Sequence, residues 1–213
     1  MTEHNLFQEV QEDLEKQKLE ALWKKYGAWI IIAALGIVVS TASSTAYRSW
    51  RADHNQRLTS AFLSAARTLP DTSKNIDLLQ KFAEENAGEN QTVLAFLRAG
   101  ALALDHNDKP KAIQFFDEAA DYAKATPAFR QLGALLSVQA QLDDGDPAKL
   151  SARLAPLTDE KAAWRFSALE TEALLALRTG DKAKAKQIFI DLSQDIRVPQ
   201  SMAARATDIL RTL

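Results

Sequence analysis

The sequence has no cysteine, only three histidines and a formal net charge of -2. Without cysteine, disulfide-stapled folds, thiol catalysis and zinc sites built on cysteine are excluded. Acidic and basic residues nearly balance, with 28 against 26. This balance argues against nucleic-acid binding, which needs a basic face to displace counterions from phosphates. The histidines, His4, His54 and His106, are far apart and lack the spacing of metal ligands.

Motifs for catalysis are also missing. The sequence has no glycine-rich phosphate loop, no Gly-x-Ser-x-Gly motif and no zincin helix. The acidic pairs Glu84-Glu85 and Asp143-Asp144 are adjacent, so on a helix their carboxylates diverge and do not share one reacting atom. We therefore expect no enzymatic activity, no cofactor, no metal and no small-molecule substrate.

Charge is absent from one long segment, residues 26–47. A helix of this length covers about 33 Å, enough for a hydrocarbon core of about 30 Å. Tyr26 and Trp29 lie near one end of the segment, and Tyr47 and Trp50 lie near the other. Such aromatic rings favour the two membrane interfaces, and basic residues flank both ends. The segment predicts one transmembrane helix in contact with membrane lipid.

Two other interpretations of this segment compete with a retained anchor. A signal peptide would explain the small residues Ser44-Thr45-Ala46 as a cleavage site, but residues 1–25 carry six acids against four lysines. Signal peptides instead begin with a short basic region. A buried core helix is disfavoured by the aromatic and basic residues at both ends.

The predicted span has a stripe of small residues. Gly36, Ser40 and Ser44 are four positions apart, so on a helix they lie on one side and allow another span to approach closely. The alternative is a stripe that faces lipid, since glycine and serine are common in spans.

The orientation follows from the position of the span. A single early span acts as an uncleaved signal anchor, and the long segment after it is translocated largely regardless of charge. We predict that residues 1–25 form a cytoplasmic amphipathic tail and that the chain beyond the span lies outside the cytoplasm. Apolar residues recur along the tail and into the start of the span, mostly at spacings of three and four, which predicts an amphipathic helix. This helix either binds a partner or is a plain extension of the span. The residues are Leu6, Phe7, Val10, Leu14, Leu19, Leu22, Trp23 and Tyr26.

Beyond the span, apolar residues recur at helical spacing and β-branched clusters are almost absent, which predicts an all-α domain. Several predicted helices begin with proline, which suits the first turn. The helices are expected at residues 53–69, 76–85, 91–104, 110–123, 127–142, 147–154, 160–179, 182–194 and 199–213.

An internal repeat organises these helices. Residues 103–112 align with residues 176–185, and a degenerate copy occupies residues 142–150. The aligned aspartates are 38 and 35 residues apart, close to the roughly 34 residues of a tetratricopeptide unit: Asp108, Asp146 and Asp181.

Small and aromatic residues fall at the positions that this repeat requires. Small side chains let two helices approach closely, and aromatic rings fill the gap to the next hairpin. The first copy has Phe96, Gly100, Ala112, Phe116 and Ala119; the third has Ala173, Gly180, Ala185 and Phe189; the middle copy instead has Val138, Leu150, Leu154 and Leu157.

We predict a tetratricopeptide-like α-solenoid rather than an irregular helical bundle. Residues 48–90 form a linker and first hairpin, and residues 91–213 form the repeats with a C-terminal capping helix.

The first helix of each pair is expected to line the concave face of such a stack. The residues predicted to line it are Leu94, Leu97, Ala101, Leu104, Leu132, Leu135, Gln139, Leu142, Leu174 and Leu177. A face this apolar needs a cover. It is either a groove for hydrophobic segments of a partner or of an emerging chain, or a face covered by helices from the chain's own ends. The covering residues would be Phe62, Leu63 and Leu69 of the linker helix, or Met202, Ile209, Leu210 and Leu213 of the last helix.

The layout resembles a known family. An acidic tail with Leu19-Glu-Ala-Leu-Trp-Lys-Lys-Tyr-Gly27 precedes one span and a helical domain with Leu78-Leu-Gln-Lys-Phe82 and Ala95-Phe-Leu-Arg-Ala-Gly-Ala-Leu-Ala103. This order is similar to that of the YfgM-like ancillary subunits of the SecYEG translocon.

The resemblance implies a single-pass protein of the bacterial inner membrane with a cytoplasmic N-terminus and a periplasmic C-terminal domain. The implied partners are the SecYEG translocon and PpiD, a membrane-anchored, prolyl isomerase-like periplasmic chaperone. A general scaffold for cell-envelope assembly or division, built on the same fold, is the alternative.

Overall fold

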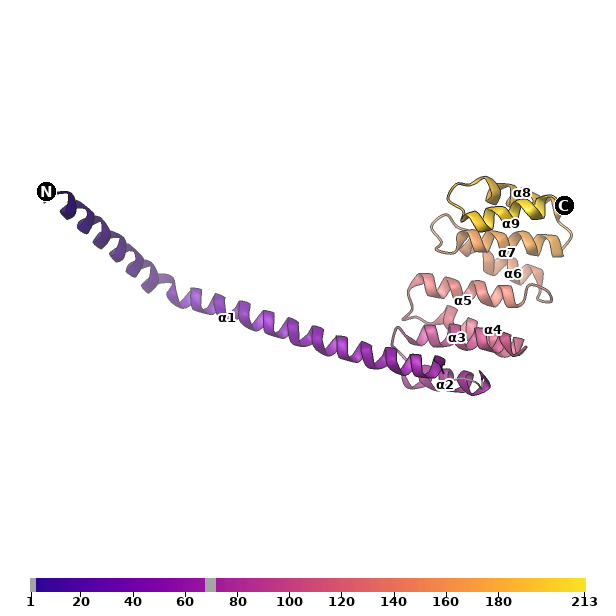
Figure 1. The fold of residues 1–213 in the computed structure, drawn as a ribbon, viewed down its shortest axis with the longest axis horizontal. Coiled ribbons are helices and arrows are strands. Elements are labelled where there is room, and N and C mark those ends of the chain that lie inside the picture. Colours follow the sequence, from indigo (N-terminus) through magenta and orange to yellow (C-terminus); the bar gives the residue numbers. More distant parts are fainter. Residues whose placement is uncertain (1–2, 68–71) are drawn as a thin grey trace. The chain divides into compact units, whose positions relative to one another are not determined.

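The computed structural model describes residues 3–67 and 72–213, and within these ranges the side chains of all residues except 3–21, 30, 33, 34, 67, 72 and 73. These ranges contain helices and no strand, which confirms the all-α prediction. The chain divides into two units, Met1–Arg57 and Leu58–Leu213. The helices, shown in Figure 1, are α1 (Glu3–Arg67), α2 (Thr72–Glu85), α3 (Thr92–Asp105), α4 (Lys109–Asp121), α5 (Pro127–Ala140), α6 (Pro147–Leu154), the 3-10 turn η1 (Ala155–Leu157), α7 (Arg165–Arg178), α8 (Lys182–Gln194) and α9 (Gln200–Leu210).

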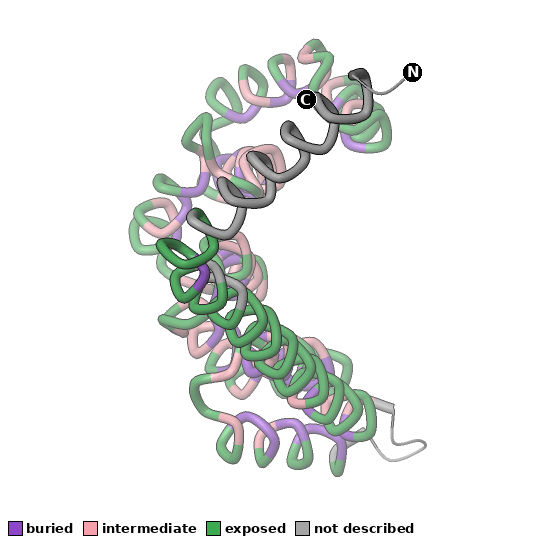
Figure 2. The backbone as a smooth tube through the Cα atoms, turned by 90° about the vertical axis from the view of Figure 1, so that its left-hand side faces the viewer, coloured by how far each residue is buried: buried purple, intermediate pink, exposed green. Residues whose placement is uncertain are grey.

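The first unit consists of α1 up to Arg57, and the helix runs without a break through the tail and the predicted span. Apart from the half-buried His54, its described side chains from residue 28 onward are exposed (Figure 2). Within the described part of the chain, which leaves out the side chains of Ile30, Ala33 and Ala34, no helix is both long and apolar enough to cross a membrane. The span therefore stays a prediction.

The second unit is a stack of helices in which each helix from α2 to α9 packs against the next one along the chain. Its first hairpin is formed by the last residues of α1 and by α2, where the rings of Phe62 and Phe82 meet edge to face with centroids 6.0 Å apart. The pairs α3/α4, α5/α6 and α7/α8 follow, and α9 closes the C-terminal end against α8. This is the predicted tetratricopeptide-like arrangement.

The three aligned aspartates occupy the same structural position. Each is the N-cap of the second helix of its pair and accepts a hydrogen bond from a backbone N–H near the start of that helix: Asp108 from Lys111 at 3.2 Å, Asp146 from Ala148 at 2.9 Å and Asp181 from Lys184 at 3.0 Å. Such caps satisfy N–H groups that have no partner inside the helix. The repeat alignment is thereby confirmed.

Two glycines allow helices to approach closely. A Cβ atom on Gly100 would lie 2.5 Å from the ring of Phe116, so the α3/α4 pair requires a residue without a side chain there. A Cβ atom on Gly133 would lie 2.7 Å from the backbone nitrogen of Ala120, so α5 lies directly against the backbone of α4. The small residue at position 100 was predicted; the one at position 133 was not.

Polar contacts between neighbouring pairs recur at about one repeat length. Their partners are 32 to 36 residues apart, because equivalent positions of successive pairs lie next to each other. They are Lys109 Nζ to Asp144 at 2.7 Å, Gln139 to the Thr171 hydroxyl at 3.0 Å, Arg153 to Asp117 at 2.6 Å, Trp164 Nε1 to the Ala128 carbonyl at 2.8 Å and Arg178 to the Leu142 carbonyl at 2.6 Å.

One predicted helix starts too early. The helix expected over residues 160–179 begins only at Arg165, and the residues before it form turns. Trp164 donates its indole N–H to α5, and the N–H of Ala163 donates to Gln131 of α5 at 2.9 Å. These tertiary bonds hold the segment in a path that local helix propensity does not reveal.

Candidate interaction surface

The predicted concave-face residues lie on α3, α5 and α7, with Leu142 just after α5. The structure brings these three helices together: α3 contacts α5, and Gln139 of α5 donates to Thr171 of α7. We call the surface formed by these residues the ladder face. The first helices of successive pairs therefore line one side, as the repeat predicts.

Accessibility differs along the ladder face. Leu104 and Gln139 are exposed, and the half-buried members are Leu94, Leu97, Ala101, Leu132, Leu142, Leu174 and Leu177. Five of the half-buried leucines pack against core clusters: Leu94 and Leu97 in the first pair, Leu142 in the middle and Leu174 and Leu177 at the C-terminal end. Leu132 and Ala101 pack against none of the clusters found among the described residues. Among the ladder-face residues, Leu132 and Leu104 are therefore the leucines most available to a partner.

The prediction for Leu135 is wrong. Its side chain is only 2% exposed and lies in a core cluster with Val138, Leu150 and Leu154. The same cluster takes in Ala168 and Leu175 of α7. The prediction placed Leu135 on the concave face, but the middle pair fills its core with leucines where the outer pairs use phenylalanines. Leu135 is consequently a packing residue.

The candidate capping residues lie at the two ends of the second unit. Phe62 packs on α2, Leu63 is exposed, and Leu69 lies outside the described residues. Met202 is buried with Phe189, and Ile209 and Leu210 pack on the same cluster, whereas Leu213 is exposed. Arg205 of α9 also donates two hydrogen bonds of 3.0 Å to Glu170 of α7. These contacts close the stack at its ends.

The predicted span stripe is exposed. Gly36, Ser40 and Ser44 are all accessible, and a Cβ atom on Gly36 would meet nothing within 4 Å. The Ser44 hydroxyl donates to the carbonyl of Thr41 at 3.0 Å. Whether another span packs here stays a prediction.

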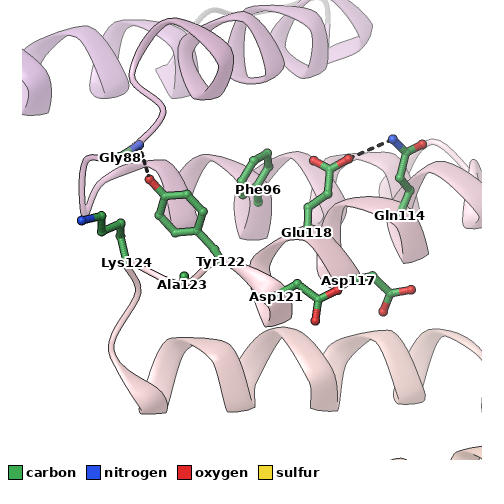
Figure 3. A pocket seen from close by; sticks show the side chains of 9 residues that line it. All are labelled: Gly88, Phe96, Gln114, Asp117, Glu118, Asp121, Tyr122, Ala123 and Lys124. Carbon is green, nitrogen blue, oxygen red and sulfur yellow. Dashed lines mark hydrogen bonds between the residues drawn. The ribbon is translucent and has the colours of Figure 1, made fainter.

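A pocket that the sequence did not reveal lies at the C-terminal end of α4, with a volume of about 620 Å³. We call it the Tyr122 pocket (Figure 3). The Tyr122 hydroxyl accepts the N–H of Gly88 at 2.7 Å and donates to the carbonyl of Glu89 at 2.9 Å. Its ring meets Phe96 of α3 edge to face, with centroids 6.0 Å apart. The other lining residues are Gln114, Asp117, Glu118, Asp121, Ala123 and Lys124.

The three carboxylates of this pocket have different surroundings. Asp117 accepts a hydrogen bond from Arg153 at 2.6 Å, and Glu118 accepts one from Gln114 at 2.9 Å. Asp121 has no hydrogen bond or ion pair with any residue that the structure describes. No sequence pattern pointed to this pocket, because Gly88 and Tyr122 are 34 residues apart and meet only through the repeat.

Elsewhere, carboxylates with shifted pKa values belong to ion pairs. The hydrogen bond from Lys109 lowers the pKa of Asp144, and the hydrogen bonds from Arg197 lower the pKa of Asp195 to about 2. Both carboxylates are bound to a neighbouring cation, so the shifts reflect structural pairing. Among the described residues, no group of three His, Asp or Glu side chains converges as metal ligands would.

Comparison with known proteins identifies a family. A family model described as a tetratricopeptide repeat-like domain matches residues 20–198. The matched range begins within α1 and ends just before α9, so it includes the uncharged segment and all three repeated pairs. No curated protein and no solved structure matches the chain.

Proposed function

The chain belongs to the tetratricopeptide repeat-like family, and on this premise we propose that it is a membrane-anchored scaffold that links the SecYEG translocon to a PpiD-like periplasmic chaperone. Repeat domains of this kind are protein-interaction scaffolds, because stacked helix pairs present an extended surface to a partner. In this proposal residues 26–47 cross the bacterial inner membrane, and the repeats lie in the periplasm.

The ladder face is the observation that carries the binding role. Both ends of the second unit are closed by their own side chains, yet Leu104 and Leu132 keep accessible apolar surface on neighbouring helices. Exposed Gln139 lies on the same helix as Leu132 and adds a polar contact. Accessible apolar side chains on successive helices, together with a polar side chain on the same face, suit an amphipathic segment of a partner.

Hydrogen bonding within α1 supports the membrane anchor. The second half of the predicted span is the less apolar half, because it is rich in hydroxyl side chains. There the hydroxyls of Thr41 and Thr45 donate to the carbonyls of Ile37 and Thr41 at 2.7 and 2.8 Å. These hydroxyls are satisfied inside the helix, which lowers the cost of placing them in hydrocarbon. The exposed rings of Trp29 and Trp50 suit the two interfaces.

The named partners rest on the family resemblance, through the order of acidic tail, single span and repeat domain. A general scaffold for envelope assembly or division uses the same architecture and is the second candidate. We propose no catalytic role, because the described carboxylates with shifted pKa values are bound to basic side chains.

Co-purification of the full chain in mild detergent tests this proposal. A tag after Leu213 should be accessible from the periplasm, and the wild-type chain should recover the translocon subunits and the chaperone. Leu132→Glu should reduce recovery about tenfold, as expected when a charge replaces an apolar contact residue. The matched control is Leu78→Glu on α2, since Leu78 is 41% exposed and lies off the ladder face; it should leave recovery unchanged.

Three results would contradict the proposal. A cytoplasmic tag would refute the orientation. Equal recovery of partners with Leu132→Glu and with the wild type would show that the ladder face does not bind them. Recovery of outer-membrane assembly or division proteins in place of the translocon would favour the second candidate.

A further inference from the structure

We propose that Ile196, in the loop between α8 and α9, is a contact residue whose side chain enters an uncharged apolar pocket of a protein partner. Its side chain is 98% exposed, whereas the other large apolar side chains described as exposed in the second unit are 36–41% exposed. The inference deepens the proposed function, on which it rests, because it names the chemistry of one partner contact. Ile196 does not belong to the ladder face, which lies on α3, α5 and α7.

A tight turn holds Ile196 in place. The N–H of Val198 donates to the carbonyl of Asp195 at 3.0 Å, and the N–H of Arg197 donates to the Asp195 carboxylate at 2.9 Å. The Arg197 guanidinium binds the same carboxylate, and Val198 is buried in a core cluster with Phe189. The residues on both sides of Ile196 are therefore fixed in the free protein. A partner has little of this loop left to order, which favours affinity.

Neither packing nor turn chemistry explains an isoleucine at this position. A side chain that is 98% exposed contributes almost nothing to the core. Ile196 is the second of the four residues in the turn 195–198, and turns favour glycine, proline, asparagine, aspartate and serine. Burial of this side chain in a complex would gain the hydrophobic stabilisation that the free protein lacks here.

The charges around the turn indicate the chemistry of the partner. The loop before α7 lies beside the turn, because Arg197 reaches Glu160 at 3.4 Å while it also binds Asp195. Residues 158–165 and 195–199 together hold three acids and three bases, so the surface is formally neutral. A neutral surface with an aliphatic side chain at its tip complements an uncharged apolar pocket better than a charged one.

A protein suits this surface better than a lipid bilayer does. Anionic lipid attracts clusters of lysine and arginine, and the surface around Ile196 has no excess of basic residues. One aliphatic side chain inserted into a bilayer gives only weak binding. A protein pocket instead contacts the side chain on several sides, and a fixed turn presents the side chain in one orientation.

Binding of a defined partner tests the inference. The probe is the purified periplasmic part of the PpiD-like chaperone, titrated by calorimetry onto the full chain in detergent micelles. Ile196→Asp should raise the Kd about tenfold, because a carboxylate is disfavoured in an apolar pocket, and Ile196→Leu should stay within about twofold of the wild type. The matched control Leu78→Asp, at an exposed position on α2, should leave the Kd unchanged. The urea midpoint of Ile196→Asp should equal that of the wild type.

A photo-crosslinking amino acid in place of Ile196, in the full chain in cells, identifies what covers the turn. A crosslink to the chaperone or to a translocon subunit would support the inference. A crosslink to a second copy of this chain, a crosslink to lipid alone, or no crosslink would overturn it.

This inference and the proposed function fail separately. If the chaperone binds the wild type and Ile196→Asp equally well, the inference is refuted and the proposed function stands. If the wild type does not bind the chaperone, that link of the proposed function is refuted, and the crosslink at position 196 decides the inference.

Discussion

The outer helix pairs, α3/α4 and α7/α8, are held together differently from the middle pair, α5/α6. The α3/α4 pair buries two phenylalanines completely, Phe115 and Phe116, and the α7/α8 pair buries Phe189. In the middle pair the second helix has only eight residues, and leucines replace the rings. All three pairs share the same aspartate cap. The cap therefore sets where the second helix begins even where the packing pattern of the repeat is lost.

Polar bridges from the neighbouring pairs hold the middle pair in place. Arg178 at the end of α7 donates to the carbonyls of Leu142 and Gly145 in the loop between α5 and α6. From the other side, Lys109 binds Asp144 in the same loop. The comparison teaches that a degenerate repeat stays in the stack when its neighbours supply contacts that its own sequence lacks.

Removing the buried rings should have the largest effect. Phe116→Ala and Phe189→Ala should each lower the free energy of unfolding by about 3–5 kcal/mol, because they leave cavities in well-packed cores. Urea unfolding of the full chain in detergent, followed by circular dichroism, measures this. The control is Phe129→Ala, which removes a ring that is 37% exposed and should cost about 1 kcal/mol or less. Equal losses at positions 116 and 129 would refute the role given to the ring.

Removing the bridge to the middle pair should have an intermediate effect. Arg178→Gln should cost about 1.5–3 kcal/mol, the range for hydrogen bonds from charged groups, because two carbonyls lose their donor. The control is Arg205→Gln, since Arg205 also binds across pairs but its side chain is 55% exposed; it should cost about 0–1 kcal/mol. The same urea unfolding measures both variants. A larger loss of unfolding free energy with Arg205→Gln than with Arg178→Gln would contradict the role given to Arg178.

The smallest expected effect is in the loop between α8 and α9. Arg197 donates to both carboxylate oxygens of Asp195 at 3.0, 3.2 and 2.8 Å and lowers the pKa of Asp195 from 3.8 to about 2. Because the folded pKa is lowered, the interaction is complete above the ordinary value and is lost as pH falls from about 4 to about 2.

Carbon NMR of the Asp195 carboxyl should therefore show a titration midpoint of about 2. Arg197→Gln should move that midpoint up toward 3.8. A wild-type midpoint already near the ordinary value would show that this ion pair does not form in solution.

The local pattern of the sequence was enough to predict most of the helices. The predicted bounds of α6 and α8 match the structure, because proline or an aspartate cap marks each start. The repeat spacing also placed Phe116 and Phe189 correctly in the core.

What the sequence could not show depends on contacts across repeats. Leu135 is buried because the middle pair uses leucines from α5, α6 and α7 together. Residues before Arg165 are not helical because they bond to α5. The Tyr122 pocket needs a loop and a helix end that meet only after the stack has formed.

Native-state hydrogen exchange tests most directly whether the middle pair is the least stable part of the stack. The amides of α6 should exchange faster than those at the centres of α4 and α8, after correction for intrinsic rates, because a short helix held from outside opens at lower free energy. Arg178→Gln should widen this difference. Protection of α6 equal to or greater than that of α4 and α8 would contradict the account.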